Sequence, residues 1–523
     1  MNTTSPNKRP TKKITKYSMG QPSKRLPKSQ KKIQKIRKHT YIRFPNKDEK
    51  LYYYHIGNDR CNLIELLRKR KINNNIIHAF SKIPRECFVE KKHHFRVYKD
   101  IPLPINYKQV TTQPSLICNM LQLLDLRPID NVLEIGTGTG FNTSIISTMV
   151  KNITTMENLK PLIKDAKKIM DILKLRKILK NNITLIRGDG ALGYKKNGPY
   201  DRIIFAAGNL AGIPDGITEQ LKEGGVLVIP IIYYKKGKKI EHVYKYVKKK
   251  GKMTRSRHLG VNFVPLTYFD GPQEDFTNKG PKDYSGIVKK RNLNTLLLHS
   301  NLALKRCRLY EVIRRRIRKD TLNAFMTIPR ELFMPFLYIE KTYNDKPHPI
   351  GYDQTISQPS LVCKMIEFLN LKKTDRVFEV GTGYGYHASL VSKLSKEVFT
   401  MDVILELVEG SREVYNFLIK NKILKNNITF LHGDGNNGYL EKAPYDKILV
   451  TCGANKKIPD ELLNQLSPNG GICVIPIKNK KTPNKEVLYR YTKNGSNIKE
   501  EELMGVRFVP FVKKPSLKTK ILI

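Results

Sequence analysis

Residues 377–385 read Val-Phe-Glu-Val-Gly-Thr-Gly-Tyr-Gly, and residues 132–140 read Val-Leu-Glu-Ile-Gly-Thr-Gly-Thr-Gly. In each stretch a short apolar run predicts a buried strand. The three glycines that follow predict a loop whose backbone can approach a ligand closely, because no side chain stands in the way. Two copies of this stretch in one chain indicate that a larger unit is repeated.

The repeat extends over about 146 residues, since residues 76–221 recur as residues 321–466 at a constant offset of 245. Ile-Pro-Arg-Glu stands at 83–86 and 328–331, and Gly-Asp-Gly stands at 188–190 and 433–435. A period of this length is a whole domain, whereas solenoid units repeat every 20–50 or so residues. The sequence therefore predicts two tandem copies of one domain.

Within each copy, apolar strand patterns alternate with helical patterns. This alternation predicts a parallel, doubly wound α/β sheet of the Rossmann-like kind. We expect a first domain at 48–267, a linker at 268–290 with Gly-Pro pairs and no regular period, and a second domain at 291–523. The Lys-rich segments 235–239 and 248–252 are expected to form hairpin or loop surfaces of the first domain.

The chain carries a net charge of +50, from 96 lysines and arginines against 46 acidic residues. Part of this charge lies in residues 1–47, which hold fifteen Lys and Arg and no Asp or Glu. This segment is poor in large apolar residues, so we expect a disordered basic arm. Its function is either to associate with nucleic acid or another polyanion, or only to keep the chain soluble.

The seven cysteines show no Cys-x-x-Cys pair and no spacing typical of metal ligands. We expect the matched Cys118 and Cys363 to be small core side chains and the cysteines to be reduced, which favours an intracellular, cytoplasmic protein. No apolar run approaches 18 residues, so no membrane span is expected. A mitochondrial presequence stays compatible with the basic, acid-free start.

Acidic residues fall at the predicted carboxyl ends of the strands, where an open α/β sheet binds its ligands. Glu157 and Asp402 lie 23 residues after Glu134 and Glu379, the position for a carboxylate that accepts two ribose hydroxyls. The third loop glycine comes one residue too early for the dinucleotide motif. The pattern favours S-adenosylmethionine over a dinucleotide, and a Rossmann fold that has lost its nucleotide is the alternative.

The motifs of the second copy, taken together, resemble protein-L-isoaspartate O-methyltransferases. The resemblance rests on Gln-Thr-Ile-Ser-Gln-Pro at 354–359, the glycine loop, His-Gly-Asp-Gly at 432–435, Pro-Tyr-Asp-Lys-Ile at 444–448 and Gly-Val-Arg-Phe-Val-Pro at 505–510. It covers about residues 60–266 and 305–512, which leaves out the arm and the linker.

The resemblance implies methyl transfer from S-adenosylmethionine to the free carboxylate of L-isoaspartyl residues in damaged proteins, which are the implied partners. It assigns catalysis to Ser357, which orients the carboxylate, and to its counterpart Thr112. Ser357 is alternatively only a cap for the helix that begins at Pro359. The implied cofactor-binding residues are Gln354, Thr355, Glu379, Gly381, Gly383, Gly385, Asp402, Asp434, Gly435 and Thr451 in the second copy, and Gln109, Glu134, Gly136, Gly138, Gly140, Glu157, Asp189 and Gly190 in the first.

The first copy departs from the family pattern at several matched positions. These departures predict weaker acceptor chemistry, so we expect the second copy to be the main catalyst. In the second copy, Tyr384 is unusual for a glycine loop and is expected either to crowd the cofactor or to point to solvent. The departures of the first copy are Thr112 for Ser357, Val110 for Thr355, Ala206 for Thr451, Asn262 for Arg507 and Phe141 for Tyr386.

Two other functions compete with protein repair. The high positive charge is compatible with a largely non-catalytic, nucleic-acid-binding scaffold built from two methyltransferase folds. A nucleic-acid methyltransferase is disfavoured, because the segments at 206–209 and 451–454 lack the Asn- or Asp-Pro-Pro-aromatic run that amino-methylating enzymes carry there.

Overall fold

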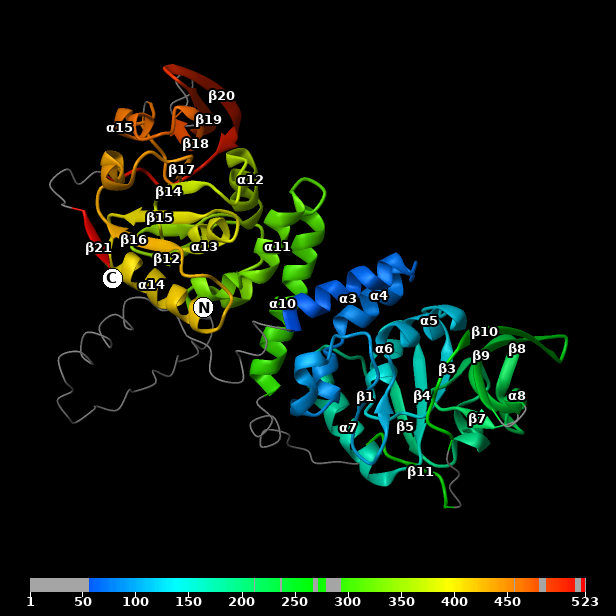
Figure 1. The fold of residues 1–523 in the computed structure, drawn as a ribbon. Helices are drawn as coiled ribbons and strands as arrows, with labels where there is room; N and C mark the ends of the chain where they lie inside the picture. Colours follow the sequence, from blue (N-terminus) through cyan, green and yellow to red (C-terminus); the bar gives the residue numbers. More distant parts are fainter. Residues whose placement is uncertain are drawn as a thin grey trace, which may run out of the picture.

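The computed structural model describes residues 56–210, 212–235, 238–266, 271–278, 293–455, 457–478, 486–512 and 519–522. These residues form two large sheets flanked by helices, and two small two-stranded sheets, with helices α3 and α10 between the two lobes (Figure 1). The predicted tandem α/β architecture is confirmed. Among the described helices, none combines the length and the apolar character that a membrane crossing needs.

The first sheet has five parallel strands at its centre, in the order β8-β6-β3-β4-β5. Antiparallel strands extend both edges, so the sheet is mixed and not purely parallel. The Lys-rich segment 248–252 forms the turn between β9 and β10, and Lys235, Lys238 and Lys239 lie at the paired ends of β8 and β9, so both Lys-rich segments belong to hairpins, as predicted. The strands are β3 (Asn131–Ile135), β4 (Asn152–Glu157), β5 (Ile183–Arg187), β6 (Tyr200–Phe205), β8 (Leu221–Lys235), β9 (Lys238–Lys249), β10 (Lys252–Gly260) and β11 (Glu274–Asp275), with the short β7 (Asn209–Leu210) beside β8.

The second sheet repeats this topology in the order β20-β19-β18-β17-β14-β15-β16-β21, with a single bridge between Ala454 and Ile477 in place of β7. Its strands are β14 (Arg376–Val380), β15 (Glu397–Asp402), β16 (Ile428–His432), β17 (Lys447–Val450), β18 (Asn469–Lys478), β19 (Glu486–Asn494), β20 (Asn497–Val506) and β21 (Lys520–Leu522).

Alternating side chains of each strand enter two separate cores. Val132 of β3 packs with the helices on one face, whereas Leu133 packs on the other face, where Ile217 of the short α8 (Ile217–Gln220) closes a smaller core. On the helical face lie α4 (Asn74–Lys82), α5 (Pro114–Leu124), α6 (Phe141–Ser147) and α7 (Lys160–Leu175) in the first copy, and α11 (Lys319–Thr327), α12 (Pro359–Leu369), α13 (Tyr386–Ser392) and α14 (Leu405–Lys420) in the second.

Part of the predicted linker belongs to the first sheet, which corrects the expectation of an irregular segment there. Glu274 and Asp275 form β11 and pair antiparallel with β5. Glu274 forms an ion pair with Arg187 at 2.9 Å, and Phe276 is buried in the core. This edge strand matches β21 of the second copy, so the repeat continues past residue 267. The remaining parts of the predicted linker, residues 268–270 and 279–290, lie outside the described residues, as does the basic arm.

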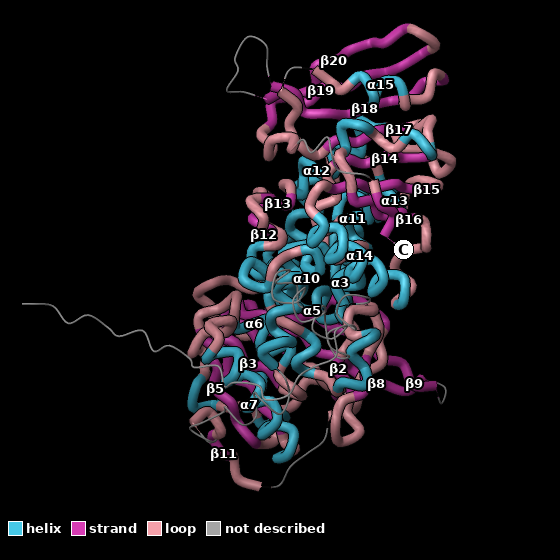
Figure 2. The backbone as a smooth tube through the Cα atoms, turned by 90° about the vertical axis from the view of Figure 1, so that its left-hand side faces the viewer, coloured by secondary structure: helices cyan, strands magenta, loops and turns pink. Residues whose placement is uncertain are grey.

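The two copies join through α3 (Gly57–Lys69) and α10 (Leu293–Ile313), which the sequence patterns did not predict as elements. Figure 2 shows these helices in the middle of the molecule, between the two sheets. Apolar residues of both copies form one continuous core here, including Leu67 and Ile313. Arg60 is 1% exposed and donates to the carbonyl of Ser300 at 3.0 Å and to its hydroxyl at 2.6 Å.

The contacts between α3 and α10 are reciprocal. Glu65 and Arg68 of the first copy match Glu311 and Arg314 of the second. Arg68 pairs with Glu311, and Arg314 pairs with Glu65 at 3.8 Å. Such exchange of equivalent partners is the mark of an isologous, twofold interface. The two copies therefore contact each other like the subunits of a symmetric dimer.

A disulfide joins Cys61 and Cys307, which are matched residues of the two copies, across a Cα–Cα distance of 5.4 Å. The expectation that all the cysteines stay reduced is wrong for this pair. Sequence spacing gave no sign of the bond, because its two partners lie 246 residues apart. The other five cysteines are free, and four of them are buried.

The bond predicts a thiol count of five in the unreduced, unfolded protein and seven after reduction, measured by alkylation and intact mass. Cys61→Ser should lower the free energy of unfolding by about 2–4 kcal/mol under non-reducing conditions, since the crosslink restricts the unfolded chain. Cys87→Ser is the control for loss of a buried thiol. Seven reactive thiols without reductant would contradict the crosslink.

Candidate functional site

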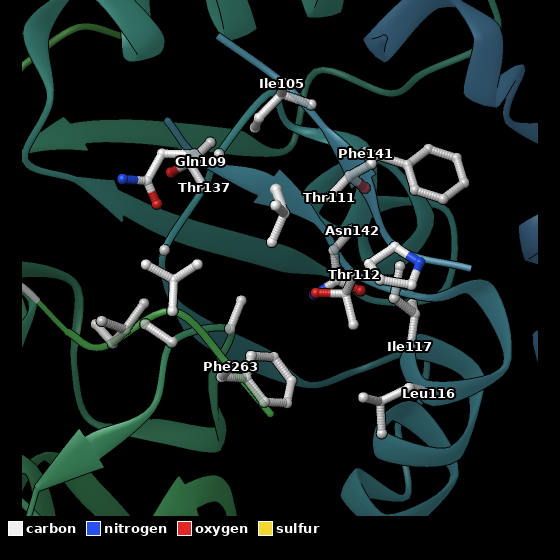
Figure 3. Close-up of a pocket in the computed structure, with 18 of the residues that line it drawn as sticks. Ile105, Gln109, Thr111, Thr112, Leu116, Ile117, Thr137, Phe141, Asn142 and Phe263 are labelled. Atoms are coloured by element: carbon white, nitrogen blue, oxygen red, sulfur yellow. The ribbon is translucent and has the colours of Figure 1, made fainter. Parts of the chain in front are cut away.

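In each copy the carboxyl ends of the parallel strands meet a glycine loop and the irregular segment that follows the β9–β10 or β19–β20 hairpin. In the first copy they enclose a cavity of about 630 Å³. Figure 3 shows Gln109, Thr112 and Asn142 around this cavity, with Phe263 on the opposite wall. The volume falls within the range typical of pockets for small-molecule cofactors.

A buried carboxylate at the end of the second parallel strand anchors the glycine loop. Asp402 Oδ2 accepts a hydrogen bond from the Gly383 N–H at 2.9 Å, and Glu157 Oε2 accepts the matching bond from the Gly138 N–H at 2.9 Å. Gly383 holds φ at +52°, a conformation that favours glycine. Burial raises the pKa of both acids, and backbone N–H donors partly oppose the rise. Both carboxylates line their cavities, at the position predicted for the ribose acceptor.

The glutamates of the strand before the loop lie beneath it and do not line either cavity. Glu134 accepts hydrogen bonds from Asn142 and Thr155, both at 2.7 Å, and from Thr143. Glu379 accepts one from Thr400 at 2.5 Å, and its Oε1 has no partner within the described residues. Burial raises the pKa of Glu134 to about 7 and that of Glu379 to about 8. Both glutamates therefore support the strand end beneath the loop, and neither reaches the cavity.

Asp189 and Asp434 follow the third parallel strand, as predicted, but their side chains turn into the local backbone. Asp189 accepts from the Ala191 N–H at 2.8 Å, and Asp434 accepts from the Asn436 N–H at 3.0 Å. Neither lines a cavity. The adjacent glycine does: a Cβ on Gly435 would lie 2.3 Å from Val380, so no larger residue fits there.

In the second copy the space divides into two smaller cavities. One, of about 70 Å³, is lined by the glycine loop and Asp402, and the other, of about 240 Å³, is lined by Ser357. Thr355 and Thr451 line both cavities. Thr451 Oγ1 donates to the Gly381 carbonyl at 2.7 Å and so lies over the loop. Val110 and Ala206 take the two threonine positions in the first copy, where a single larger cavity results.

Tyr384 neither crowds the cavity nor points to solvent, so both expectations for it are wrong. Its side chain is 2% exposed and packs in the main core of the second copy, together with Ile350 of the strand β12 (His348–Gly351).

The loop that carries Ser357 is held by a buried arginine. Arg330 is fully buried and donates to the carbonyls of Thr342 at 3.0 Å and Ser357 at 2.6 Å. In the first copy, Arg85 donates likewise to the Thr112 carbonyl at 3.1 Å. The residue that caps α12 is Gln358, so the alternative role of Ser357 as the helix cap is not observed.

Charges differ between the acceptor ends of the two cavities. Lys364 and Arg507 line the cavity of Ser357. The matched residues that line the first cavity are Asn119 and Asn262, which are neutral. Arg70 is a cation at the first cavity, but it pairs with Asp100 at 3.2 Å. The second copy is therefore the one whose acceptor cavity presents unmatched positive charge to an anionic acceptor.

Most of the predicted site residues line a cavity, and six do not. The lining residues are Gln109, Thr112, Gly136, Gly138, Glu157 and Gly190 in the first copy, and Gln354, Thr355, Ser357, Gly381, Gly383, Asp402, Gly435 and Thr451 in the second. The residues behind the walls are Glu134, Gly140, Asp189, Glu379, Gly385 and Asp434.

Two pairs of supporting residues escaped the sequence prediction. Arg85 and Arg330 stand in the repeated Ile-Pro-Arg-Glu motif, whose identity in both copies was the available signal. Glu241 Oε1 accepts from the Phe263 N–H at 2.9 Å, and Glu486 accepts likewise from Phe508. These glutamates position the segment that carries Asn262 or Arg507.

The raised pKa of Glu379 predicts a pH-dependent contribution to stability. Between its ordinary pKa of 4.5 and its folded value of about 8, the folded state binds a proton that the unfolded state does not. Stability from this group is therefore lost as pH rises from about 5 to 8. The thermal unfolding midpoint of the wild type minus that of Glu379→Gln should therefore decrease as the pH rises over this range. The same difference for Glu134→Gln should decrease only up to about pH 7. A difference between wild type and Glu379→Gln that does not change with pH would contradict the assignment.

Comparison with known proteins matches both copies to one family. The family model for protein-L-isoaspartate(D-aspartate) O-methyltransferase matches residues 58–270 and 306–516. A protein-L-isoaspartate O-methyltransferase of Dictyoglomus thermophilum is 43% identical over 208 residues, which are 39% of this chain and 90% of that protein. One from Ignicoccus hospitalis is 43% identical over 200 residues, 38% of this chain and 90% of that protein.

Among solved structures, a putative protein-L-isoaspartate O-methyltransferase from Plasmodium falciparum in complex with S-adenosyl-L-homocysteine is 25% identical, with a TM-score of 0.35. It covers 39% of this chain and 97% of its own. Each of these relatives has the length of one copy. With the family model matching most of its residues, the chain belongs to the protein-L-isoaspartate(D-aspartate) O-methyltransferase family, in a two-copy form.

Proposed function

We propose that the chain methylates the free carboxylate of L-isoaspartyl residues with S-adenosylmethionine, and that the second copy carries most of this activity. The observation that supports this choice of copy is the cavity in which Ser357, Lys364 and Arg507 adjoin the glycine-loop cavity. The first copy has the larger cavity but lacks both cations at the acceptor end. In our proposal it binds the cofactor and transfers methyl groups more slowly.

The residues present fit the cofactor. Asp402 would accept hydrogen bonds from its ribose hydroxyls, and the loop at Gly381 and Gly383 would lie against it without side chains. When bound, the cofactor supplies an electrophilic methyl group on a sulfonium.

The protein has little proton chemistry to perform. An acceptor carboxylate is already ionised at neutral pH, because its ordinary pKa is about 4, so no general base is needed. Lys364 and Arg507 attract the carboxylate, and the Ser357 hydroxyl donates to one oxygen while the other oxygen attacks. Holding the two reactants in line lowers the barrier by several kcal/mol. The new methyl ester then loses methanol as the next backbone nitrogen closes a succinimide, which water opens partly to normal aspartate.

Ser357→Ala should lower kcat on an isoaspartyl peptide about tenfold or more and leave cofactor affinity nearly unchanged, since the hydroxyl faces the acceptor. Arg507→Asn introduces the residue found at the matched position of the first copy. It should raise KM for the peptide with a smaller effect on kcat. Steady-state methyl transfer to an isoaspartyl peptide and its aspartyl twin measures both. Thr112→Ala is the matched control; if it abolished activity while Ser357→Ala did not, the roles of the copies would be reversed.

Asp402→Ala should weaken cofactor binding at the second site about tenfold or more, because a hydrogen bond to a charged group contributes about 1.5–3 kcal/mol. Calorimetric titration with S-adenosylhomocysteine should resolve this site from the first, where Glu157→Ala is the matched change. Unchanged affinity in Asp402→Ala would show that the ribose binds elsewhere.

We further propose that residues 1–47, which lie outside the described residues, bind nucleic acid or another polyanion. The support is their fifteen positive charges without a negative one. We also propose that the protein is cytoplasmic. The five free cysteines favour this location, whereas disulfides such as Cys61–Cys307 are more common in oxidising compartments.

Deletion of residues 1–47 should cut affinity for DNA or RNA severalfold and reduce the salt dependence of binding, because fewer counterions are released. Methylation of a short isoaspartyl peptide should stay unchanged. Nucleic-acid affinity that survived the deletion intact would assign binding to the folded copies alone.

A further inference from the structure

The outer hairpins of the two sheets carry opposite charge. The β9–β10 hairpin of the first copy, residues 238–260, holds nine lysines and arginines against one glutamate, a net charge of +8. The β19–β20 hairpin of the second copy, residues 486–506, holds three against four glutamates, a net charge of −1. Because the two hairpins share one topology, the fold itself does not require the basic composition.

The difference is sharpest at two matched positions of the edge strand. Arg255 lies opposite Tyr246, and Glu500 lies opposite the matched Tyr491. Arg257 and Glu502 likewise lie opposite Tyr244 and Tyr489. Both arginines are exposed, and neither forms an ion pair within the described part of the chain. Two guanidinium groups therefore face solvent where the second copy has carboxylates.

Aromatic rings follow the arginines along the same face. Tyr233, His242, Tyr244 and Tyr246 form a row with successive ring centroids 6.1, 6.5 and 6.3 Å apart. The Arg255 guanidinium lies 5.8 Å from the Tyr244 ring centroid. The first three rings are partly exposed.

The second copy has a shorter row. It keeps only Tyr489 and Tyr491, because Lys478 and Val487 take the places of Tyr233 and His242. On this face of the sheet the first copy therefore has two rings and two arginines that the second copy lacks.

We propose that the β9–β10 hairpin binds single-stranded nucleic acid, with phosphates on Arg255 and Arg257 and bases against the row of rings. Positive side chains that follow the backbone, interleaved with aromatic rings that stack on bases, are the features by which proteins hold single strands. This binding surface goes beyond the methyl-transfer function and is separate from the N-terminal arm.

The position of the hairpin places the bound nucleic acid beside the first-copy cavity. β10 is the last strand at its edge of the sheet. Its end leads into the first-copy cavity, which Leu259, Gly260 and Asn262 line. A single strand bound along β10 would thus reach the mouth of that cavity.

A second copy of this chain is the competing occupant, since the acidic β20 edge could meet the basic β10 edge. The charges favour nucleic acid over this partner. A net −1 hairpin neutralises little of a +8 hairpin, and two chains of +50 repel each other. Pairing of two strand edges also uses backbone hydrogen bonds, so it would not explain the additional rings of Tyr233 and His242.

The experiment uses the full chain and a fluorescein-labelled 20-nucleotide poly(U) RNA, with binding followed by anisotropy from 50 to 300 mM salt. R255E/R257E should lose about tenfold or more in affinity, and its salt slope should fall by about 1.4, since each single-strand phosphate contact contributes about 0.7. K420E/K425E, which changes the charge equally at exposed lysines of the second copy, should lose less than about threefold. Equal losses in the two variants would overturn the proposal.

Tyr244→Ala should lower affinity about fivefold or more without changing the salt slope, because stacking releases no counterions. Tyr489→Ala is the matched control in the second copy and should have no effect. Unchanged methylation and thermal unfolding show that the variants are folded, and R255Q/R257Q replaces the charge reversal if they are not. The surface would be an interface between chains if R255E/R257E instead abolished self-association in sedimentation and left RNA binding intact.

Discussion

A carboxylate at the end of one parallel strand accepts a hydrogen bond from the glycine loop that follows the neighbouring strand, and both copies depend on this contact. In the second copy the partners are Asp402 and the Gly383 N–H. The contact fixes the loop conformation, places a buried acid in the cavity wall and sets the space left for a ligand. Arg330, the Ser357 loop and the segment held by Glu486 then close around that space.

The two copies show what this framework tolerates. The backbone, the anchoring acids and the buried arginines are common to both, whereas the side chains at the acceptor end differ. Replacement of Thr451 by Ala206 and of two cations by asparagines changes the size and charge of the cavity without changing the strands that support it. In the proposed function, cofactor binding depends mainly on the residues that the copies share, and selection of the acceptor depends on those that differ.

The sequence was sufficient for the strands, the glycine loops and the acids at strand ends, because these follow from local apolar runs and fixed spacings. It was not sufficient for α10, because its apolar residues are spread around the helix and no amphipathic stripe marks the side that packs in the shared core. The Cys61–Cys307 bond, the pairing of β11 and the burial of Tyr384 all depend on contacts between distant segments. The direction of the Asp434 side chain depends on a local turn that spacing alone does not reveal.

The reciprocal contacts of α3 and α10 carry a consequence for how the two sites can diverge. In a symmetric dimer of identical chains every substitution appears in both subunits, so a change that suits one site is imposed on the other. Covalent fusion of the two subunits removes that constraint while it keeps the twofold contact and a fixed one-to-one ratio. The shared interface can therefore stay nearly symmetric, as the Glu65–Arg314 and Arg68–Glu311 pairs show, while each cavity and each outer hairpin follows its own course.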